Sequence, residues 1–282
     1  MNRHLFRFAI GLLIAFFGFI TYLTTTVENP VTGEKQRVQL SPRQEVALGL
    51  QARSQMASQY GGLYPSQELQ QYVNQVGERV AQKSEATKAG YPYDFYLLRD
   101  PKTVNAFALP GGQIFITAAL MKRLQSEAQL AGVLGHEIGH VVGRHGAEHL
   151  AKQKLGSALV TAVGVAASDD RGGGQQAAVI AQAVNQLVSL QYGREDELES
   201  DRLGVRFMSE AGYNPQAMVE VMRILQTASG GTGKPEFLSS HPNPGNRLQR
   251  LQELIAQQYP NGVPANLEFG RERFASLVSS RL

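Results

Sequence analysis

The sequence predicts an α+β fold that is mainly α, with a small β-sheet beside one central helix. Apolar residues recur at helical spacing over much of the chain, whereas alternating stretches cluster between residues 93 and 117. A chain of 282 residues can bury a substantial core, and one or two domains are expected at this length. We divide it into an N-terminal segment (1–27), a linker (28–40), a main domain (41–260) and a C-terminal tail (261–282).

The overall composition excludes several classes of function. The hydrophobic share of 43% is ordinary for a globular protein. The net charge of +3 comes from scattered Lys and Arg residues, so we expect no nucleic acid among the partners. The chain has no Cys, which excludes disulfides, a thiol nucleophile, Cys-ligated zinc and a lipidated Cys.

Residues 1–27 have the pattern of a membrane anchor or a secretory signal. Arg3 and Arg7 precede an uncharged and almost wholly apolar stretch, residues 8–23. This stretch is short for a bilayer span, but the residues after it can extend it, and no A-x-A-like cleavage site follows. We favour an uncleaved anchor over a cleaved signal, with a buried N-terminal helix as a third alternative. The basic flank predicts that the rest of the chain is exported.

Two helices are predicted after the linker. Residues 29–33 form a turn-rich segment, and Ser41 followed by Pro42 begins a helix that runs to about residue 60. Ser66 begins a second helix with apolar residues at helical spacing. Both helices are expected to be scaffold.

Three short strands follow the two helices. They are predicted at residues 93–99, 104–109 and 113–117. An edge strand beside an active-site cleft can bind an extended peptide through main-chain hydrogen bonds. Asn105–Ala108 is our candidate for that strand, and an ordinary hairpin explains the pattern equally well.

The predicted central helix begins at Ser126 and carries the motif H-E-x-x-H at residues 136–140. His136 and His140 lie one turn apart on the same helix face. Two imidazoles in that arrangement can bind one Zn²⁺, and Glu137 can act as general base on a water molecule. A core helix with two hydrogen-bonded histidines is the alternative.

Four glycines interrupt this helix, at positions 132, 135, 139 and 143. Each costs about 1 kcal/mol relative to Ala in a helix interior. Close approach of another backbone would explain their presence.

A second motif, H-x-x-E-H, occupies residues 145–149. On a straight helix His145 and His149 point away from the first pair, so the two pairs cannot share a metal. Gly143 and Gly146 also interrupt the surroundings of the second motif. We therefore assign metal binding to the first pair and a structural or surface role to His145 and His149.

Zinc held by two histidines needs a third protein ligand, and the acidic run 194–201 supplies candidates. Glu197 and Asp201 share one helix face, whereas Glu195 and Glu199 face elsewhere. One of the first two can bind the metal while the other accepts the free ring N–H of a metal-bound imidazole. Taken alone, such a run is typical of a solvated helix face.

Two segments near this run leave alternatives open. Residues 150–192 are predicted to form a helical hairpin, with membrane contact as the minor alternative. His241 follows a Gly-rich loop and is held extended by Pro242. It either reaches the metal cleft or caps the last helix.

Four segments match the motifs of a known family. They are NAFALPGGQIFITAAL (105–120), HEIGHVVGRH (136–145), GREDELESD (193–201) and SHPNPGNRL (240–248). Together they resemble the zinc metallopeptidases typified by HtpX, the mitochondrial Oma protease and the CAAX prenyl protease. The resemblance implies a zincin-like fold of the gluzincin type, with Glu197 as third ligand and Asp201 orienting an imidazole. Gly193 departs from the family pattern, which has Ser there.

The resemblance is closest to periplasmic bacterial members that act in outer-membrane quality control, without a tetratricopeptide domain. We therefore expect an endopeptidase with one Zn²⁺ bound by His136, His140 and Glu197, and with Glu137 as the base. His241 would either latch the site, by taking the open metal position, or assist catalysis.

The expected substrates are unfolded or misassembled proteins of the bacterial cell envelope. The protein would be anchored in the inner membrane through residues 8–23 with a periplasmic domain, or periplasmic if that segment is cleaved. The alternative from another class is a zinc-stabilised chaperone or adaptor that binds unfolded chains. An intact Glu137 argues against it, because binding alone needs no base.

Overall fold

The computed structural model describes residues 26–152, 182–183, 190–228, 235–242, 246–279 and 281–282. The fold is mainly α with two small sheets, as predicted. None of the helices in these ranges is long and apolar enough to cross a membrane. The apolar stretch 8–23, predicted to be an anchor, lies outside the described residues, as does most of the hairpin predicted at 150–192.

The larger sheet has three strands in the order β3–β5–β4. They are β3 (Asp94–Leu98), β4 (Ala106–Leu109) and β5 (Gln113–Thr117). β5 runs parallel to β3 and antiparallel to β4, with Ala106 opposite Ile116. β4 is therefore an edge strand of the sheet, as the peptide-binding hypothesis requires.

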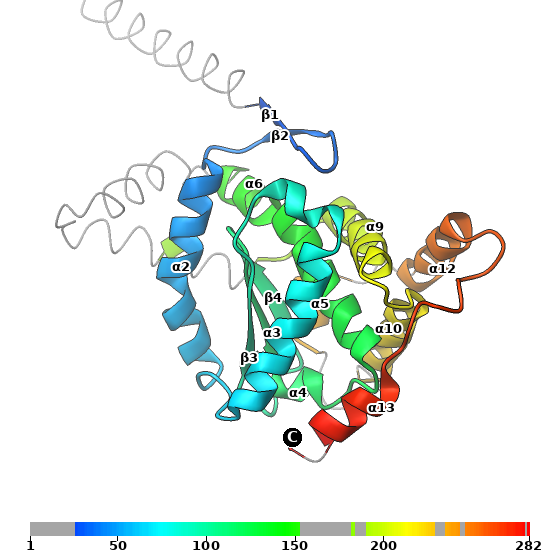
Figure 1. Ribbon diagram of the computed structural model, residues 1–282. Helices are drawn as coiled ribbons and strands as arrows, with labels where there is room; N and C mark the ends of the chain where they lie inside the picture. The colour runs from blue at the N-terminus through cyan, green and yellow to red at the C-terminus, as the bar shows by residue number, and fades with distance from the viewer. Residues whose placement is uncertain (1–25, 153–181, 184–189, 229–234, 243–245, 280) are drawn as a thin grey trace, which may run out of the picture.

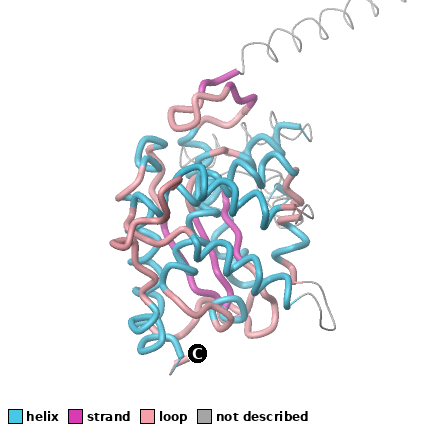
Figure 2. Tube along the Cα trace, turned by 90° about the vertical axis from the view of Figure 1, so that its right-hand side faces the viewer, coloured by secondary structure: helices cyan, strands magenta, loops and turns pink. Residues whose placement is uncertain are grey.

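Helices cover both faces of this sheet (Figures 1 and 2). Helix α2 (Pro42–Gln59) begins at the predicted cap Ser41 and packs on the face that carries Phe115. Helices α3 (Gln67–Gln82) and α5 (Glu127–Val142) pack on the opposite face, which carries Ile114 and Ile116. Successive side chains of each strand point to opposite faces of the sheet, and the two faces belong to two separate apolar clusters. Every residue of α5 is buried.

Helix α5 packs tightly against helix α9 (Arg194–Glu210). A Cβ added to Gly139 would lie 2.9 Å from the Cα and the carbonyl oxygen of Ser200. A Cβ added to Gly204 would lie 3.0 Å from the amide nitrogen of His136. The predicted close approach of a second backbone is therefore confirmed, and α9 is the partner.

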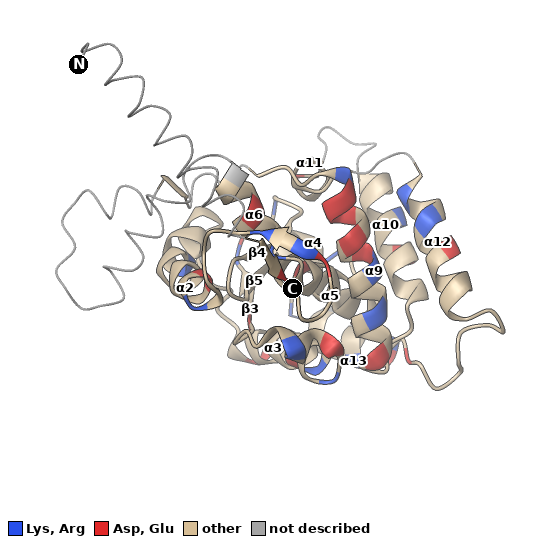
Figure 3. Ribbon diagram, turned by 90° about the horizontal axis from the view of Figure 1, so that it is seen from above, with Lys and Arg blue, Asp and Glu red and all other residues tan. Residues whose placement is uncertain are grey.

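The remaining elements complete the domain around this pair of helices. They are η1 (Glu85–Ala89), α4 (Ala118–Met121), α6 (His145–Lys152), α10 (Gln216–Ala228), α11 (Phe237–Ser240), α12 (Arg247–Gln258), α13 (Arg271–Phe274) and η2 (Ala275–Ser279). Asp and Glu residues gather on α9 in the view of Figure 3. The acidic run is therefore helical, as predicted.

Residues of the predicted linker and tail contact the main domain. A hairpin of β1 (Thr26–Glu28) and β2 (Lys35–Arg37) begins at the end of the predicted N-terminal segment and continues into the linker, and Asn29 Nδ2 donates to the Val142 carbonyl over 2.7 Å. In the tail, Phe274 is only 2% exposed and lies in the main apolar cluster. The tail therefore contributes an apolar side chain to the main cluster.

Candidate metal centre

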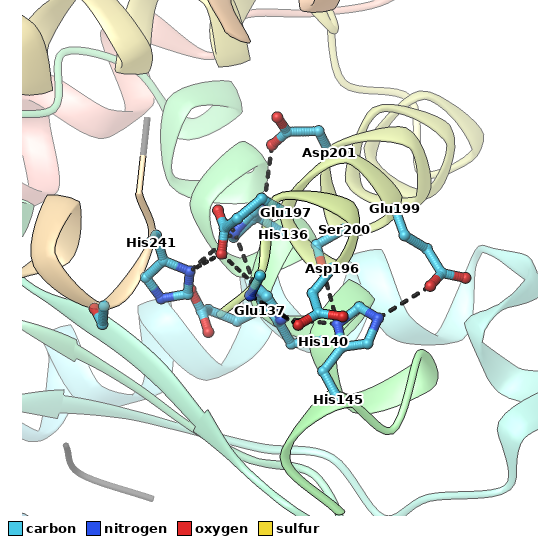
Figure 4. A network of polar contacts seen from close by, with 12 residues as sticks. His136, Glu137, His140, His145, Asp196, Glu197, Glu199, Ser200, Asp201 and His241 are labelled. Atoms are coloured by element: carbon cyan, nitrogen blue, oxygen red, sulfur yellow. Dashed lines mark hydrogen bonds and ion pairs between the residues drawn. The ribbon is translucent and has the colours of Figure 1, made fainter. Parts of the chain in front are cut away.

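Three elements bring the predicted site residues together (Figure 4). Helix α5 carries His136, Glu137 and His140, α9 carries Glu197, and His241 follows the short helix α11. One ligand atom from each of His136, His140, Glu197 and His241 lies within 4.8 Å of all the others. All four side chains are buried.

The ligand atoms of the cluster converge on one point. His136 Nε2 and His140 Nε2 are 3.1 Å apart, and they lie 3.5 and 3.4 Å from the Glu197 carboxylate. His241 Nδ1 lies 2.9 Å from Glu197 Oε1 and 3.3 Å from His136 Nε2. Two imidazoles and a carboxylate are the donor set of a His₂Glu zinc site.

Unpartnered polar atoms at the centre also fit a bound metal. Within the described part of the chain, both carboxylate oxygens of Glu137 and the Nε2 atom of His241 are buried without a hydrogen-bond partner. Buried polar atoms are normally hydrogen-bonded to protein or water. These atoms fit a centre that holds a metal ion and a water molecule.

Behind His136, Asp201 and Arg247 form a buried network. His136 Nδ1 lies 3.0 Å from Asp201 Oδ1, so Asp201 stands where the sequence predicted an orienting carboxylate. Arg247 donates to both Asp201 oxygens over 2.7 Å, and its Nη1 lies 2.6 Å from Glu197 Oε2. Burial alone would raise the pKa of Asp201, but the Arg247 charge outweighs it and lowers that pKa. Arg247 was not among the residues predicted for the site.

The pKa values of the other two acids of the centre, Glu137 and Glu197, shift in opposite directions. Burial raises the pKa of Glu137, which favours the proton affinity that a general base needs. The pKa of Glu197 is well below its usual range, because His241 and Arg247 outweigh the effect of its burial. Glu197 is thus kept as a carboxylate, the form that binds a metal.

The segment that carries His241 is fastened to the edge of the sheet. The Phe237 amide donates to the Val104 carbonyl over 3.1 Å, and the Phe237 ring stacks on His241 with 4.4 Å between ring centroids. Glu236 accepts from the Tyr60 hydroxyl over 2.5 Å and from Asn105 Nδ2 over 2.9 Å. These contacts hold His241 in the centre, where it is the C-terminal cap residue of α11. The cap residue of α12 is Asn246, so His241 does not cap that helix.

A narrow cavity joins the edge strand to the centre. Its lining includes Asn105, Phe107 and Ala108 on one side, and Tyr192 and His241 on the other. The strand proposed from the sequence as a peptide-binding edge therefore shares a cavity with His241 of the candidate centre. The Tyr192 ring, which also lines the cavity, stacks on the candidate ligand His140 with 3.9 Å between centroids.

The placement predicted for His145 is wrong, because α5 does not run straight into α6. The chain turns at Arg144, whose φ of 55° is in the left-handed region. The turn brings His145 Nδ1 to 2.9 Å from His140 Nδ1. His149 lies farther out and pairs with Asp196 over 2.8 Å.

Comparisons with known proteins agree with this geometry. The model of peptidase family M48 matches residues 67–255. The beta-barrel assembly-enhancing protease of Yersinia pestis is 31% identical over 251 residues, which cover 85% of this chain and 50% of the relative. The protein of that name from Escherichia coli K12 is 32% identical over 207 residues, covering 71% and 42%.

A mitochondrial relative is similar over a larger share of its length. The mitochondrial metalloendopeptidase OMA1 of Schizosaccharomyces pombe is 30% identical over 255 residues, which cover 89% of this chain and 73% of the relative. The chain spans half or less of the length of the two bacterial relatives. The fold and the candidate site fit the class of metallopeptidase to which the names of these relatives refer. The chain belongs to peptidase family M48.

Proposed function

We propose that the protein is a zinc-dependent endopeptidase in which His136, His140 and Glu197 hold the metal. The observation that carries the proposal is the convergence of these three buried groups beside the two free oxygens of Glu137. A zinc ion bound there supplies Lewis acidity toward the peptide carbonyl and water. Glu137 accepts the proton of the attacking water and passes it to the leaving amine.

Asp201 has a separate role in this proposal. By accepting the Nδ1 proton of His136, it keeps Nε2 of that ring free to face the metal. Arg247 lies against both Asp201 and Glu197, offsets part of their negative charge and fixes the position of both carboxylates. The attraction of Arg247 favours the ionised form of both buried acids.

We further propose that the substrates are unfolded or misassembled proteins of the bacterial envelope, bound in extended form along Asn105–Ala108. Among the described strands β4 lies at the edge of the sheet, and this supports an extended substrate because an edge strand can pair with a further chain. The names of the bacterial relatives connect those proteins with β-barrel assembly. Attachment to the membrane through residues 8–23 is part of the same proposal.

The test is to incubate the purified chain with an unfolded protein, before and after a zinc chelator removes the metal. We expect cleavage that the chelator abolishes and added zinc restores. Cleavage that survives complete metal removal would contradict the proposal. Binding of the unfolded protein without cleavage, in the zinc-loaded form, would favour the chaperone or adaptor alternative.

We propose that His241 acts as a latch on this site. Its ring is fully buried, and its Nδ1 lies 2.9 Å from Glu197 and 3.3 Å from His136 Nε2. In that place it competes for the open metal position that water needs.

The His241→Ala variant decides among three roles. A latch predicts that basal proteolysis of an unfolded substrate rises, because the open position becomes free. A fall in proteolysis would instead show that His241 assists the reaction, for example by a hydrogen bond to the oxyanion. Unchanged proteolysis would exclude both roles and leave a packing role only.

A further inference from the structure

We propose that His145 and Glu199 form a relay that positions His140 for metal binding, an inference that rests on the zinc role proposed above. His145 belongs to the second histidine motif, to which the proposed reaction assigns no role. It is only 2% exposed, and it is the residue that meets the outer edge of the His140 ring. Figure 4 shows His140, His145 and Glu199 side by side.

The distances define a consistent path for the ring protons. His140 Nε2 faces the cluster and must be free of a proton to bind a metal, so its proton is on Nδ1. That N–H donates to His145 Nδ1 over 2.9 Å, and His145 Nε2–H donates to Glu199 Oε2 over 3.0 Å. Both rings are neutral in this arrangement, and the relay ends on a carboxylate.

Both predicted histidine ligands are thus oriented by a hydrogen bond from Nδ1 that leads to a carboxylate. His136 donates directly to Asp201, whereas His140 reaches its carboxylate through a second imidazole. Ser200 of α9 lies beside the contact between the two imidazoles, with its Oγ 3.4 Å from His145 Nδ1. Ser200 sits where α9 presses on Gly139, so a larger acidic side chain cannot replace it there without moving the helices.

The local backbone is arranged around the His145 ring. Arg144 holds the left-handed conformation, and its guanidinium is fixed by Glu45 and by the Leu40 carbonyl at 2.6 and 2.7 Å. A Cβ on Gly143 would come within 2.5 Å of His145 Nε2, so only glycine leaves room for the ring. Backbone strain such as that of Arg144 is common at functional sites. Here the strained Arg144 and the adjacent Gly143 fix the position of the His145 side chain.

The experiment measures the zinc dissociation constant of the full chain in detergent by competition with a chromophoric chelator. His145→Phe keeps the ring volume but removes the acceptor, and Glu199→Ala removes the end of the relay. Each is expected to weaken zinc binding by about 10–100-fold, as loss of an orienting partner does. His145→Asn keeps an oxygen acceptor near Nδ1 and should bind within about threefold of wild type.

Two measurements separate this role from general damage. The matched control is His149→Phe, which removes the next imidazole and its own pair with Asp196 but touches none of the cluster. It should leave zinc affinity unchanged. In ¹⁵N-labelled protein the relay predicts slowly exchanging imidazole N–H signals from His140 and His145, and Glu199→Ala should shift or broaden the signal of His145.

The outcomes are distinct for the two proposals. Zinc binding by a folded His145→Phe as tight as wild type would overturn the relay, as would equal losses in His145→Phe and His149→Phe. If His145→Phe does not fold, Glu199→Ala decides in the same way, because Glu199 is partly exposed at the helix surface. A wild-type chain that binds no zinc would overturn the proposed function itself.

Discussion

At the scale of single residues, the centre depends on charges that are buried and paired. Glu197 and Asp201 are nearly inaccessible to solvent, and Arg247 between them is only 1% exposed. Removing one partner of such a group leaves an uncompensated charge, which costs more than the pair contributes. The three side chains therefore act as one unit that keeps Glu197 ionised and aimed at the two imidazoles.

The sequence predicted part of this unit. Spacing of four residues placed Glu197 and Asp201 on one helix face, and the structure brings both to the histidines. Arg247 was missed because arginine is usually exposed, and the composition of the chain does not show which arginine is buried. A signal was present, since Arg247 shares its helix face with the buried residues Leu251 and Ile255.

Our first prediction concerns Glu197. Glu197→Ala should lose most of its zinc, because the carboxylate lies 3.4–3.5 Å from the Nε2 atoms of both predicted histidine ligands. Glu195→Ala is the matched control, since Glu195 is exposed on another face of the same helix. Elemental analysis of the folded proteins checks this. A zinc-loaded Glu197→Ala, or an equally depleted Glu195→Ala, would mean that α9 supplies a different ligand.

At the scale of elements, the pair α5 and α9 forms the frame of the site. The glycines of α5 predicted that a backbone packs closely there, but no local pattern could say which one. The turn of the chain at Arg144, directly after α5, also could not be predicted from the sequence. A left-handed Arg144 is stabilised by Glu45 and the Leu40 carbonyl, about a hundred residues earlier in the chain. Contacts that distant cannot be inferred from helical periodicity.

The second prediction compares two glycines of α5. In Gly139→Ala the new Cβ meets Ser200 backbone at 2.9 Å, so the helices must separate. Overpacking costs about 1–3 kcal/mol, more than the roughly 1 kcal/mol that Ala gains in a helix. In Gly135→Ala the nearest atom, the Gly204 carbonyl oxygen, is at 3.3 Å, and the two effects should nearly cancel. Denaturant unfolding checks the order, and a Gly139→Ala as stable as Gly135→Ala would contradict it.

At the scale of the whole molecule, the two ends of the described chain fasten opposite ends of α5. The hairpin β1–β2 donates from Asn29 and Gln36 to the carbonyls of Val142 and Gly143 at its C-terminal end. Arg273 in the tail binds Glu127 at its N-terminal end over 2.5–2.6 Å. The sequence predicted a linker and a tail here, because short polar segments carry no periodic apolar pattern.

The third prediction follows from the docked hairpin. The fragment of residues 26–282 should be soluble without detergent and bind zinc, as expected if residues 8–23 form an anchor. Residues 41–282 should also fold but melt at a lower temperature, because the Val142 and Gly143 carbonyls lose their partners at a helix end. Thermal unfolding compares the two. Equal midpoints would show that the hairpin adds no stability, and aggregation of 26–282 would place residues 1–25 in the core.

The central claim is that one buried centre binds zinc through His136, His140 and Glu197 while Glu137 serves only as base. The Glu137→Gln variant tests it most directly, because the change removes a proton acceptor and no proposed ligand. Zinc content and cleavage of an unfolded substrate are measured on the same preparation. We predict about one zinc per chain, as in wild type, with cleavage reduced at least about 100-fold. Retained cleavage above a few per cent, or loss of the zinc, would contradict the assignment.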